Sequence, residues 1–280
     1  MKKITRRSFL AAAGLTAAAL ALTACGGSSS STASSVASSA AASSEAASSS
    51  AAAAELTTVE AGKLTMATNA AFPPYEMTTD AGEFEGIDVD TAKAIAEKLG
   101  LELQIDDMDF DAALLSVQQG KADIVMAGVT VTDERKAVMD FSDSYATGIQ
   151  SIIVPEGSDI TSPDDLAGKK IGTQRGTTGY IYCSDDFGDE NVVAYDDGLT
   201  AVQALNNGQV DAVVIDNAPA KEFIAANPGL VILETSYAEE DYAIGLAKGS
   251  SLEDAINSAL EELKADGTLQ SIVDKYISAE

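Results

Sequence analysis

The stretch KADIVMAGVTVTDERKAVMDFSD, residues 121–143, is the segment around which we expect the chain to fold. Its first part, Ala122–Ala127, is a short apolar run rich in Ile and Val, which predicts a buried strand. The run stops at Gly128, where the lack of a side chain lets the backbone come close to a bound molecule. Because ligands of open α/β sheets lie beyond the carboxyl ends of strands, the stretch predicts a binding site as well as a strand.

The polar groups that follow this strand suit a carboxylate. Thr130 adds a hydroxyl on an extended segment, and Arg135 adds a planar fork of N–H donors. A second interpretation stays open at this point, because most arginines are solvated or make weak surface pairs. In that interpretation Arg135 pairs with a neighbouring acid: Asp133, Glu134 or Asp140.

Composition narrows the class of function. The 280 residues contain no His, which excludes histidine-based acid–base catalysis, Ser-His-Asp triads and histidine metal sites. The formal net charge of −27 makes nucleic acid a very poor partner. We expect no cofactor and no metal.

The first 24 residues predict an export signal. Four basic residues (Lys2, Lys3, Arg6 and Arg7) precede an apolar stretch from Phe9 to Leu22, which is shorter than the ~20 residues of a membrane span. Thr5–Leu10 resembles a twin-arginine signal, although a general secretory signal remains open.

Cys25 directly follows these 24 residues, and the segment Leu22–Cys25 resembles a bacterial lipobox. Acylation of Cys25 would supply the two or more chains that stable anchoring needs. Residues 25–58 are mostly Ser and Ala and predict a flexible tether. We therefore expect an exported protein, lipid-anchored on the outer face of the cell membrane, or facing the periplasm in a two-membrane host.

Beyond the tether, strand-like and helix-like segments alternate, which predicts an α/β fold. The predicted strands are Lys63–Thr68, Leu101–Ile105, Ala122–Ala127, Ser151–Val154, Lys170–Thr173, Val192–Tyr195, Val210–Asp216, Leu230–Leu233 and Ala243–Ala247. The predicted helices are Asp88–Leu99, Phe110–Gln119, Leu199–Asn206, Ala218–Ala226, Leu252–Ala265 and Thr268–Tyr276. Further helix starts are expected at Ser162 and after Gly179.

An internal repeat indicates two similar halves. The segment 117–125 (VQQGKADIV) resembles the segment 205–213 (LNNGQVDAV), each with a helix end, a Gly, an Asp and a buried strand. The first strand leads to Gly128 and Thr130, and the second leads to Asp216. Two lobes of similar plan would bring these polar groups to one cleft.

A cleft of this kind matches a zwitterion. Arg135 would face a carboxylate, and Thr177 and Thr178 would add hydroxyls and backbone N–H groups at the start of a helix. Asp216, at the end of an apolar strand, would receive an ammonium group. Asp216 can equally cap the helix that starts near Ala218, and both roles can hold at once. The pattern predicts an α-amino acid as ligand.

Several motifs resemble one family, the polar-amino-acid-binding lipoproteins of ABC importers (bacterial extracellular solute-binding proteins, family 3). The resemblance spans Leu64 to the C-terminus in order and spacing. The motifs are AFPPYE (71–76), GIDVD (86–90), GKAD (120–123), AGVTVTDER (127–135), DFS (140–142), GTT (176–178) and DNAP (216–219).

The resemblance implies a two-lobe periplasmic-binding-protein-like (type II) fold with a hinge and an inter-lobe ligand cleft. It implies lobe 1 from residues 59–147 and 243–280 and lobe 2 from residues 148–242. Arg135 and Thr130 would hold the α-carboxylate with help from Thr178. Asp216 and the Gly128 carbonyl would take the α-ammonium.

The resemblance also places side chains around the ligand. Phe72 and Phe110 would flank the ligand side chain, with Tyr75 nearby, and core packing is the alternative for these rings. Three positions depart from the glutamine-binding pattern, which has an acid, a lysine and a histidine there. They are Asn69, Gln174 and Ile215, and the amino acid that binds is left open.

The family implies binding without catalysis: closure over an amino acid and delivery to ABC permease subunits, by a monomer. An amino-acid sensor is an alternative function. A cyclohexadienyl-dehydratase-like enzyme on the same fold is another, and the absence of His counts against it.

Overall fold

The computed structural model describes residues 56–277. The predicted signal, Cys25 and nearly all of the tether lie outside the described residues, so those predictions are untested. Within the described part, none of the helices combines the length and apolar character that a bilayer span requires.

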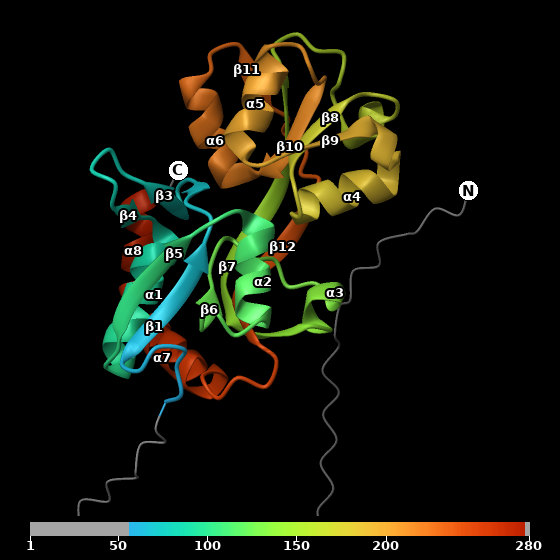
Figure 1. The fold of residues 1–280 in the computed structure, drawn as a ribbon. Coiled ribbons are helices and arrows are strands. Elements are labelled where there is room, and N and C mark those ends of the chain that lie inside the picture. Colours follow the sequence, from blue (N-terminus) through green and yellow to red (C-terminus); the bar gives the residue numbers. More distant parts are fainter. Residues whose placement is uncertain (1–55, 278–280) are drawn as a thin grey trace, which may run out of the picture. The chain divides into compact units, whose positions relative to one another are not determined.

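The strands form one large mixed sheet and one small antiparallel sheet (Figure 1). In the large sheet the order is β5-β1-β6-β12-β7-β10-β8-β9, with β11 beside β7, and the small sheet is β2-β3-β4. The strands are β1 Lys63–Thr68, β2 Ala71–Phe72, β3 Glu76–Thr78, β4 Phe84–Glu85, β5 Glu102–Asp107, β6 Ile124–Val125, β7 Met139–Pro155, β8 Ile171–Gln174, β9 Val192–Tyr195, β10 Ala212–Asp216, β11 Leu230–Ile232 and β12 Ala238–Ala247.

The helices pack against the faces of this sheet and against one another. They are α1 Ile87–Leu99, α2 Phe110–Gln118, α3 Asp133–Lys136, α4 Thr178–Phe187, α5 Gly198–Asn206, α6 Asn217–Ala226, α7 Glu253–Ala265 and α8 Thr268–Tyr276, with short 3-10 helices at Pro163–Leu166 and Asp189–Asn191. The alternation of strands and helices confirms the predicted α/β class.

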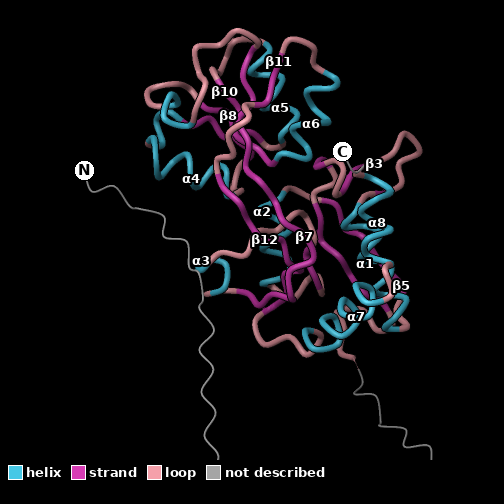
Figure 2. Tube along the Cα trace, turned by 180° about the vertical axis from the view of Figure 1, so that it is seen from behind, coloured by secondary structure: helices cyan, strands magenta, loops and turns pink. Residues whose placement is uncertain are grey.

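Two long strands, β7 and β12, run antiparallel through the middle of the sheet (Figure 2). On one side, β12 pairs with β6, which joins β1 and β5 and, with α1, α2, α7 and α8, forms lobe 1. On the other side, β7 pairs with β10 and β11, which with β8, β9 and α4–α6 form lobe 2. The predicted crossings at residues 147/148 and 242/243 fall inside β7 and β12, and the residue at which each lobe begins stays a prediction.

The Tyr242 ring lies over Gly148 of β7, two residues along from its ladder partner Ala146. The Tyr242 side chain is fully buried, and a Cβ atom built on Gly148 would overlap its ring. Gly148 therefore provides the space that the ring occupies.

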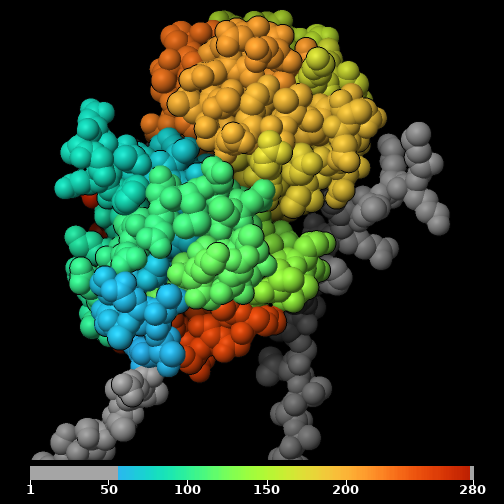
Figure 3. All heavy atoms as spheres, viewed as in Figure 1, coloured from blue at the N-terminus to red at the C-terminus, as the bar shows by residue number. Residues whose placement is uncertain are grey.

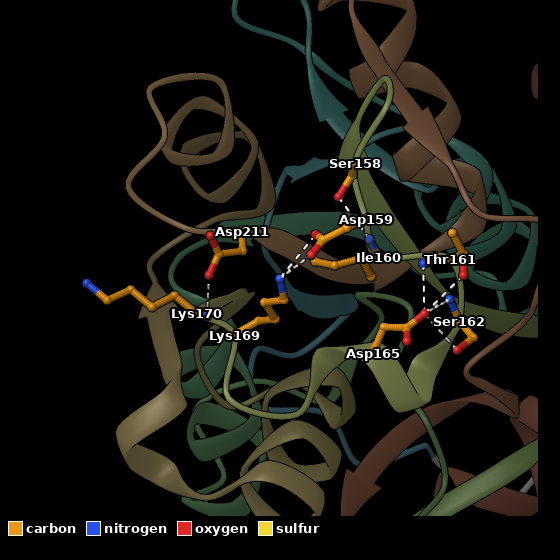
Figure 4. Close-up of polar contacts among 9 residues, drawn as sticks. All are labelled: Ser158, Asp159, Ile160, Thr161, Ser162, Asp165, Lys169, Lys170 and Asp211. Atoms are coloured by element: carbon orange, nitrogen blue, oxygen red, sulfur yellow. Dashed lines mark hydrogen bonds and ion pairs between the residues drawn. The ribbon is translucent and has the colours of Figure 1, made fainter.

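The internal repeat has a structural reason. Gly120 and Gly208 lie two residues after the ends of α2 and α5. Their φ angles are 65° and 66°, a conformation that favours glycine. The aspartate that follows each glycine binds the backbone of the neighbouring strand. Asp123 accepts from the Thr65 N–H at 2.7 Å, and Asp211 accepts from the Lys170 N–H at 2.8 Å (Figure 4).

The helix start predicted at Ser162 is present, as a 3-10 turn. Ser162 and Asp165 form a capping box around Pro163, and the Asp165 carboxylate also accepts from Thr161 (Figure 4). Four donors on one carboxylate oxygen hold the pKa of Asp165 below its usual value.

The structure differs from the prediction where pairing between distant segments decides the element. The predicted strand Ser151–Val154 is the end of β7, which begins at Met139 because β12 supplies ladder bonds across a polar segment. The predicted strand Ala122–Ala127 pairs only at Ile124–Val125, although the whole run is buried. The small sheet β2-β3-β4 was not among the predicted strands.

The C-terminal helices complete the core of lobe 1. Leu260 of α7 is fully buried and packs in the same cluster as Leu64 of β1 and Ile95 of α1. The chain thus returns to lobe 1 after building lobe 2, and Figure 3 shows the C-terminal red spheres beside the N-terminal blue ones.

Truncating Leu260 tests whether α7 is part of the core of lobe 1. Leu260→Ala is expected to lower the free energy of unfolding by about 2–5 kcal/mol, because the cavity cannot collapse in a packed core. Leu115→Ala is the matched control, since Leu115 is a helical leucine with 49% of its surface exposed, and it should cost less than about 1 kcal/mol. Equal losses in urea denaturation would contradict the assignment of α7 to the core.

Candidate functional site

A small cavity, partly open to solvent, is lined by elements of both lobes. Every residue predicted to bind ligand lines it, except Tyr75. Those residues are Asn69, Phe72, Phe110, Gly128, Thr130, Arg135, Gln174, Thr177, Thr178 and Asp216. Glu76 and Ala127 also line it and were not predicted. The structure brings the predicted residues together, while their contacts with a ligand stay predictions.

Arg135 is held by the short helix α3. The Thr132 hydroxyl caps this helix by accepting from the Arg135 N–H at 3.2 Å. The guanidinium is 8% exposed and donates to the Thr130 carbonyl at 2.8 Å and, across the cavity, to the Gly176 carbonyl at 3.2 Å. The alternative of a surface pair does not apply, because Arg135 is buried, its guanidinium donates to these two carbonyls, and Asp140 pairs with Lys248. Burial lowers the pKa of Arg135 from its ordinary value, but arginine remains a cation.

The start of α4 faces the same cavity. The Thr177 hydroxyl caps the helix by accepting from the Tyr180 N–H at 3.4 Å, and Thr178 is the first helical residue. The Thr178 side chain is buried. The positive end of the α4 dipole, together with Arg135, makes this part of the cavity suitable for an anionic group.

Asp216 ends β10 and is 7% exposed. Its side chain makes no capping bond to α6, so the capping alternative is wrong for the side chain. Instead, its carboxylate accepts hydrogen bonds from Gln150 at 2.8 Å and from the Tyr242 hydroxyl. Burial, and then the charge of Glu240, raises the pKa of Asp216 to about 7. Such a buried carboxylate lacks a cation, and an ammonium group would supply one.

Glu240 was missed by the sequence analysis. It is 6% exposed, and its Oε2 accepts from Thr130, Thr178 and Gln150 at 3.0, 3.0 and 3.1 Å. The alternation of side chains along a strand could have placed Glu240 on the same face as Tyr242. It could not show which face meets the cavity, since that depends on the register of β12 against β7.

The aromatic residues fill two roles. The Phe72 ring lines the cavity and stacks on Tyr75, with centroids 5.8 Å apart. The Tyr75 ring packs edge-on against the Tyr242 ring, with centroids 5.3 Å apart, and Tyr75 does not line the cavity. Phe110 lines the cavity, and the Arg135 guanidinium lies 5.3 Å from its centroid. Packing and cavity roles therefore coexist for Phe72 and Phe110.

Gly128 is required by the approach of Phe72. Its φ angle is 54°, and a Cβ atom there would lie 2.8 Å from the Phe72 ring. The Gly128 N–H donates to the buried Asp88 carboxylate at 3.0 Å, and Tyr145 donates to the same carboxylate at 2.7 Å. Burial raises the pKa of Asp88 to about 6 and that of its neighbour Glu76 well above the usual value.

Asn69 and Gln174 meet across the cavity. The Gln174 amide donates to the Asn69 side-chain oxygen at 2.8 Å, and Asn69 donates to the Met108 carbonyl at 3.0 Å. Ile215 lies in the lobe 2 core, next to Asp216. The described residues contain no group of three or more acidic or Cys side chains suited to a metal ion.

Asp216→Asn tests the electrostatics of this site. Because the folded state raises the Asp216 pKa to about 7, above the ~3.9 of an unfolded aspartate, the ionised group destabilises the fold above pH 7, and this cost fades as the pH falls towards 4. The variant should therefore gain on the order of 1 kcal/mol at pH 8 and lose this gain near pH 4.

The measurement is the free energy of unfolding of the free protein at both pH values. Asp241→Asn, an exposed aspartate on the same strand as Glu240, is the control and should show no such gain. A pH-independent difference for Asp216→Asn would contradict the assigned pKa shift.

Comparison with known proteins identifies the family. The model of the bacterial extracellular solute-binding proteins, family 3, matches residues 64–279. The L-cystine-binding protein TcyJ of Escherichia coli (strain K12) is 32% identical over 226 residues, covering 79% of this chain and 85% of its own. The arginine-binding extracellular protein ArtP of Bacillus subtilis (strain 168) is 33% identical over 228 residues, covering 78% and 87%.

A solved structure agrees with the fold. The arginine-, lysine-, histidine-binding protein ArtJ of Geobacillus stearothermophilus superposes with a TM-score of 0.75 at 34% identity, covering 78% of this chain and 96% of its own. The likeness confirms the predicted two-lobe, type II arrangement. With the family model spanning the body and these relatives matching most of its length, the chain belongs to the bacterial extracellular solute-binding proteins, family 3.

Proposed function

We propose that this protein binds a free α-amino acid in the cavity between its lobes and delivers it to an ABC importer. The observation that carries the proposal is the pair of opposite charges that line one cavity: buried Arg135 from lobe 1 and buried Asp216 from lobe 2. Arg135 binds the α-carboxylate, and Asp216, with the Gly128 carbonyl, binds the α-ammonium.

The remaining lining residues would surround the ligand side chain. Phe72 and Phe110 offer apolar ring surface, while Asn69 and Gln174 offer amides that both donate and accept hydrogen bonds. Neutral amides here favour a polar end on the ligand. The relatives are named for cystine and for arginine, both of which have such an end.

Closure of the lobes couples binding to transport. A ligand that touches Arg135 in one lobe and Asp216 in the other binds the closed form better than the open one, and so shifts the population towards closure. The closed form then docks on the permease. Conversion of the ligand is no part of this function, since the relatives reported above are named as binding proteins.

For the N-terminal region we propose anchoring through Cys25. A lipid on Cys25, followed by the Ser/Ala-rich residues 28–54, would hold the binding body near the outer face of the membrane while leaving it free to meet a permease. We propose that the body acts as a monomer.

A ligand screen followed by calorimetry tests amino-acid binding. A tight ligand among the twenty amino acids, cystine and ornithine should raise the unfolding midpoint by mass action. Arg135→Ala should then weaken its Kd on the order of 100-fold or more, because the ligand carboxylate loses its buried partner. Arg175→Ala, which removes an exposed arginine, is the control. Unchanged affinity for Arg135→Ala would remove this residue from the site.

Cys25→Ala tests the anchor. In a bacterial host the full chain should sediment with membranes and carry lipid detectable by mass spectrometry of its N-terminal peptide, because two acyl chains bind a bilayer stably. The variant should leave the membrane fraction. Membrane association that persists in Cys25→Ala would argue against a lipid on this residue.

A further inference from the structure

A second buried carboxylate, Glu240, lies next to the Asp216 side of the cavity. It belongs to β12, one of the two long strands shared by the lobes (Figure 1). Its Oε2 receives hydrogen bonds from the Thr130 and Thr178 hydroxyls and from the Gln150 amide. Its Oε1 is buried without a partner among the described residues.

Gln150 ties the two carboxylates into one network. Its amide nitrogen donates to Asp216 at 2.8 Å and to Glu240 at 3.1 Å, so one NH₂ group links both acids. This amide is neutral, and the two acids therefore share donors without any charge compensation from it. A buried pair of carboxylates held this way is costly unless a cation joins it.

Glu240 determines the direction in which the Thr130 and Thr178 hydroxyls donate their hydrogen bonds. Thr130 and Thr178 line the cavity, whereas Glu240 does not. Each hydroxyl has one proton, and an ionised carboxylate can only accept. When Glu240 is ionised, the two hydroxyls donate to it and are left with oxygen lone pairs for a ligand. They then add acceptors to the cavity wall that already holds Asp216.

We propose that Glu240 is a positioning residue of the ammonium subsite. It turns the Thr130 and Thr178 hydroxyls so that they accept hydrogen bonds from the ligand, and it adds a second negative charge beside Asp216. The subsite thereby requires a full ammonium cation and disfavours a neutral donor. This inference rests on the proposed function. It assigns the Thr130 and Thr178 hydroxyls to the ammonium instead of the carboxylate that the family resemblance implies, and it leaves the ligand carboxylate to Arg135 and the backbone N–H groups at the start of α4.

The charges around Asp216 support this role. Tyr242 donates to Asp216 from β12, and Gln150 donates from β7. Glu240 is the acid whose charge acts most strongly on the Asp216 pKa.

Other ionisable groups also face Asp216. The charge of Asp216 acts on Tyr75 and Glu76 from the β2–β3 region and on Arg135 of α3. Lys221 of α6 lines an outer surface cavity together with Asp216. Of these groups, Glu240 is the one that shares a hydrogen-bond donor, the Gln150 amide, with Asp216.

Replacing Glu240 by glutamine has a consequence that loss of packing would not produce. Without the negative charge of Glu240, the pKa of Asp216 falls, so Asp216 stays ionised to a lower pH. Binding of an ammonium needs ionised Asp216, and affinity therefore declines on the acid side of its pKa. The variant should bind more weakly at pH 8 and yet keep that affinity further into acid.

The experiment is calorimetry from about pH 5 to about pH 8.5, using the amino acid identified by the thermal screen, whose α-groups keep their charges in this range. Glu240→Gln should weaken binding at pH 8 by roughly tenfold and move the acid limb of the affinity profile down by about one pH unit. Glu239→Gln, an exposed neighbour on the same strand, should change neither value. Wild-type affinity, or an unmoved limb, in Glu240→Gln overturns the proposal.

A second readout separates this inference from the proposed function. Carbon NMR of the free protein labelled at aspartate carboxyls follows Asp216 directly, with Asp216→Asn to assign its signal. Glu240→Gln should lower the titration midpoint of Asp216, and an unchanged midpoint overturns the proposed coupling even if amino acids bind. If no amino acid binds the wild type, the proposed function fails and with it the subsite, whatever the midpoint.

Discussion

The pairing of β7 with β12 is the interaction on which the rest of the structure depends. These strands continue the large sheet from lobe 1 into lobe 2, so the two lobes share it. The same pairing places Gln150, Glu240 and Tyr242 next to the end of β10, where Asp216 lies. A strand pair that joins two lobes and also supports the cavity couples their relative position to what the cavity holds.

The electrostatics of the cavity follow from that arrangement. Arg135 reaches it from α3 and is held by the carbonyls of Thr130 and Gly176, while Asp216 and Glu240 receive only neutral donors. The arginine is thus oriented, and neither acid forms an ion pair with a described residue, while the charges of both act on Arg135 from a distance. A zwitterion reverses this imbalance, because its ammonium neutralises the acids and its carboxylate satisfies the remaining N–H groups of the arginine. Burial of the two carboxylates destabilises the free protein, and binding of the ligand ammonium would remove this cost and so strengthen binding.

The proposed function divides the cavity lining into two parts. In it, the charged pair Arg135 and Asp216 would bind the groups that all α-amino acids share. Asn69 and Gln174, which hydrogen-bond to one another, lie among the rings that would surround the ligand side chain. Relatives that are named for cystine and for arginine fit a common scaffold in which this second region is adjusted. Discrimination between ligands then depends on a few neutral side chains rather than on the charged pair.

Local sequence determined much of this protein: the alternation of strands and helices, the glycines after α2 and α5, and the polar groups Gly128, Thr130, Arg135 and Asp216 near strand ends, since each follows from nearby hydrophobic patterns and turn residues. The family resemblance added Asn69, Phe72, Phe110 and Gln174 to the cavity lining. Only the tertiary structure decided the length of β7 and the participation of Glu240. Both depend on β12, whose residues lie about a hundred positions away from their β7 partners, and no local pattern encodes that register. A buried carboxylate in a polar run such as Ala238–Asp241 looks like a solvated one until the pairing strand covers it.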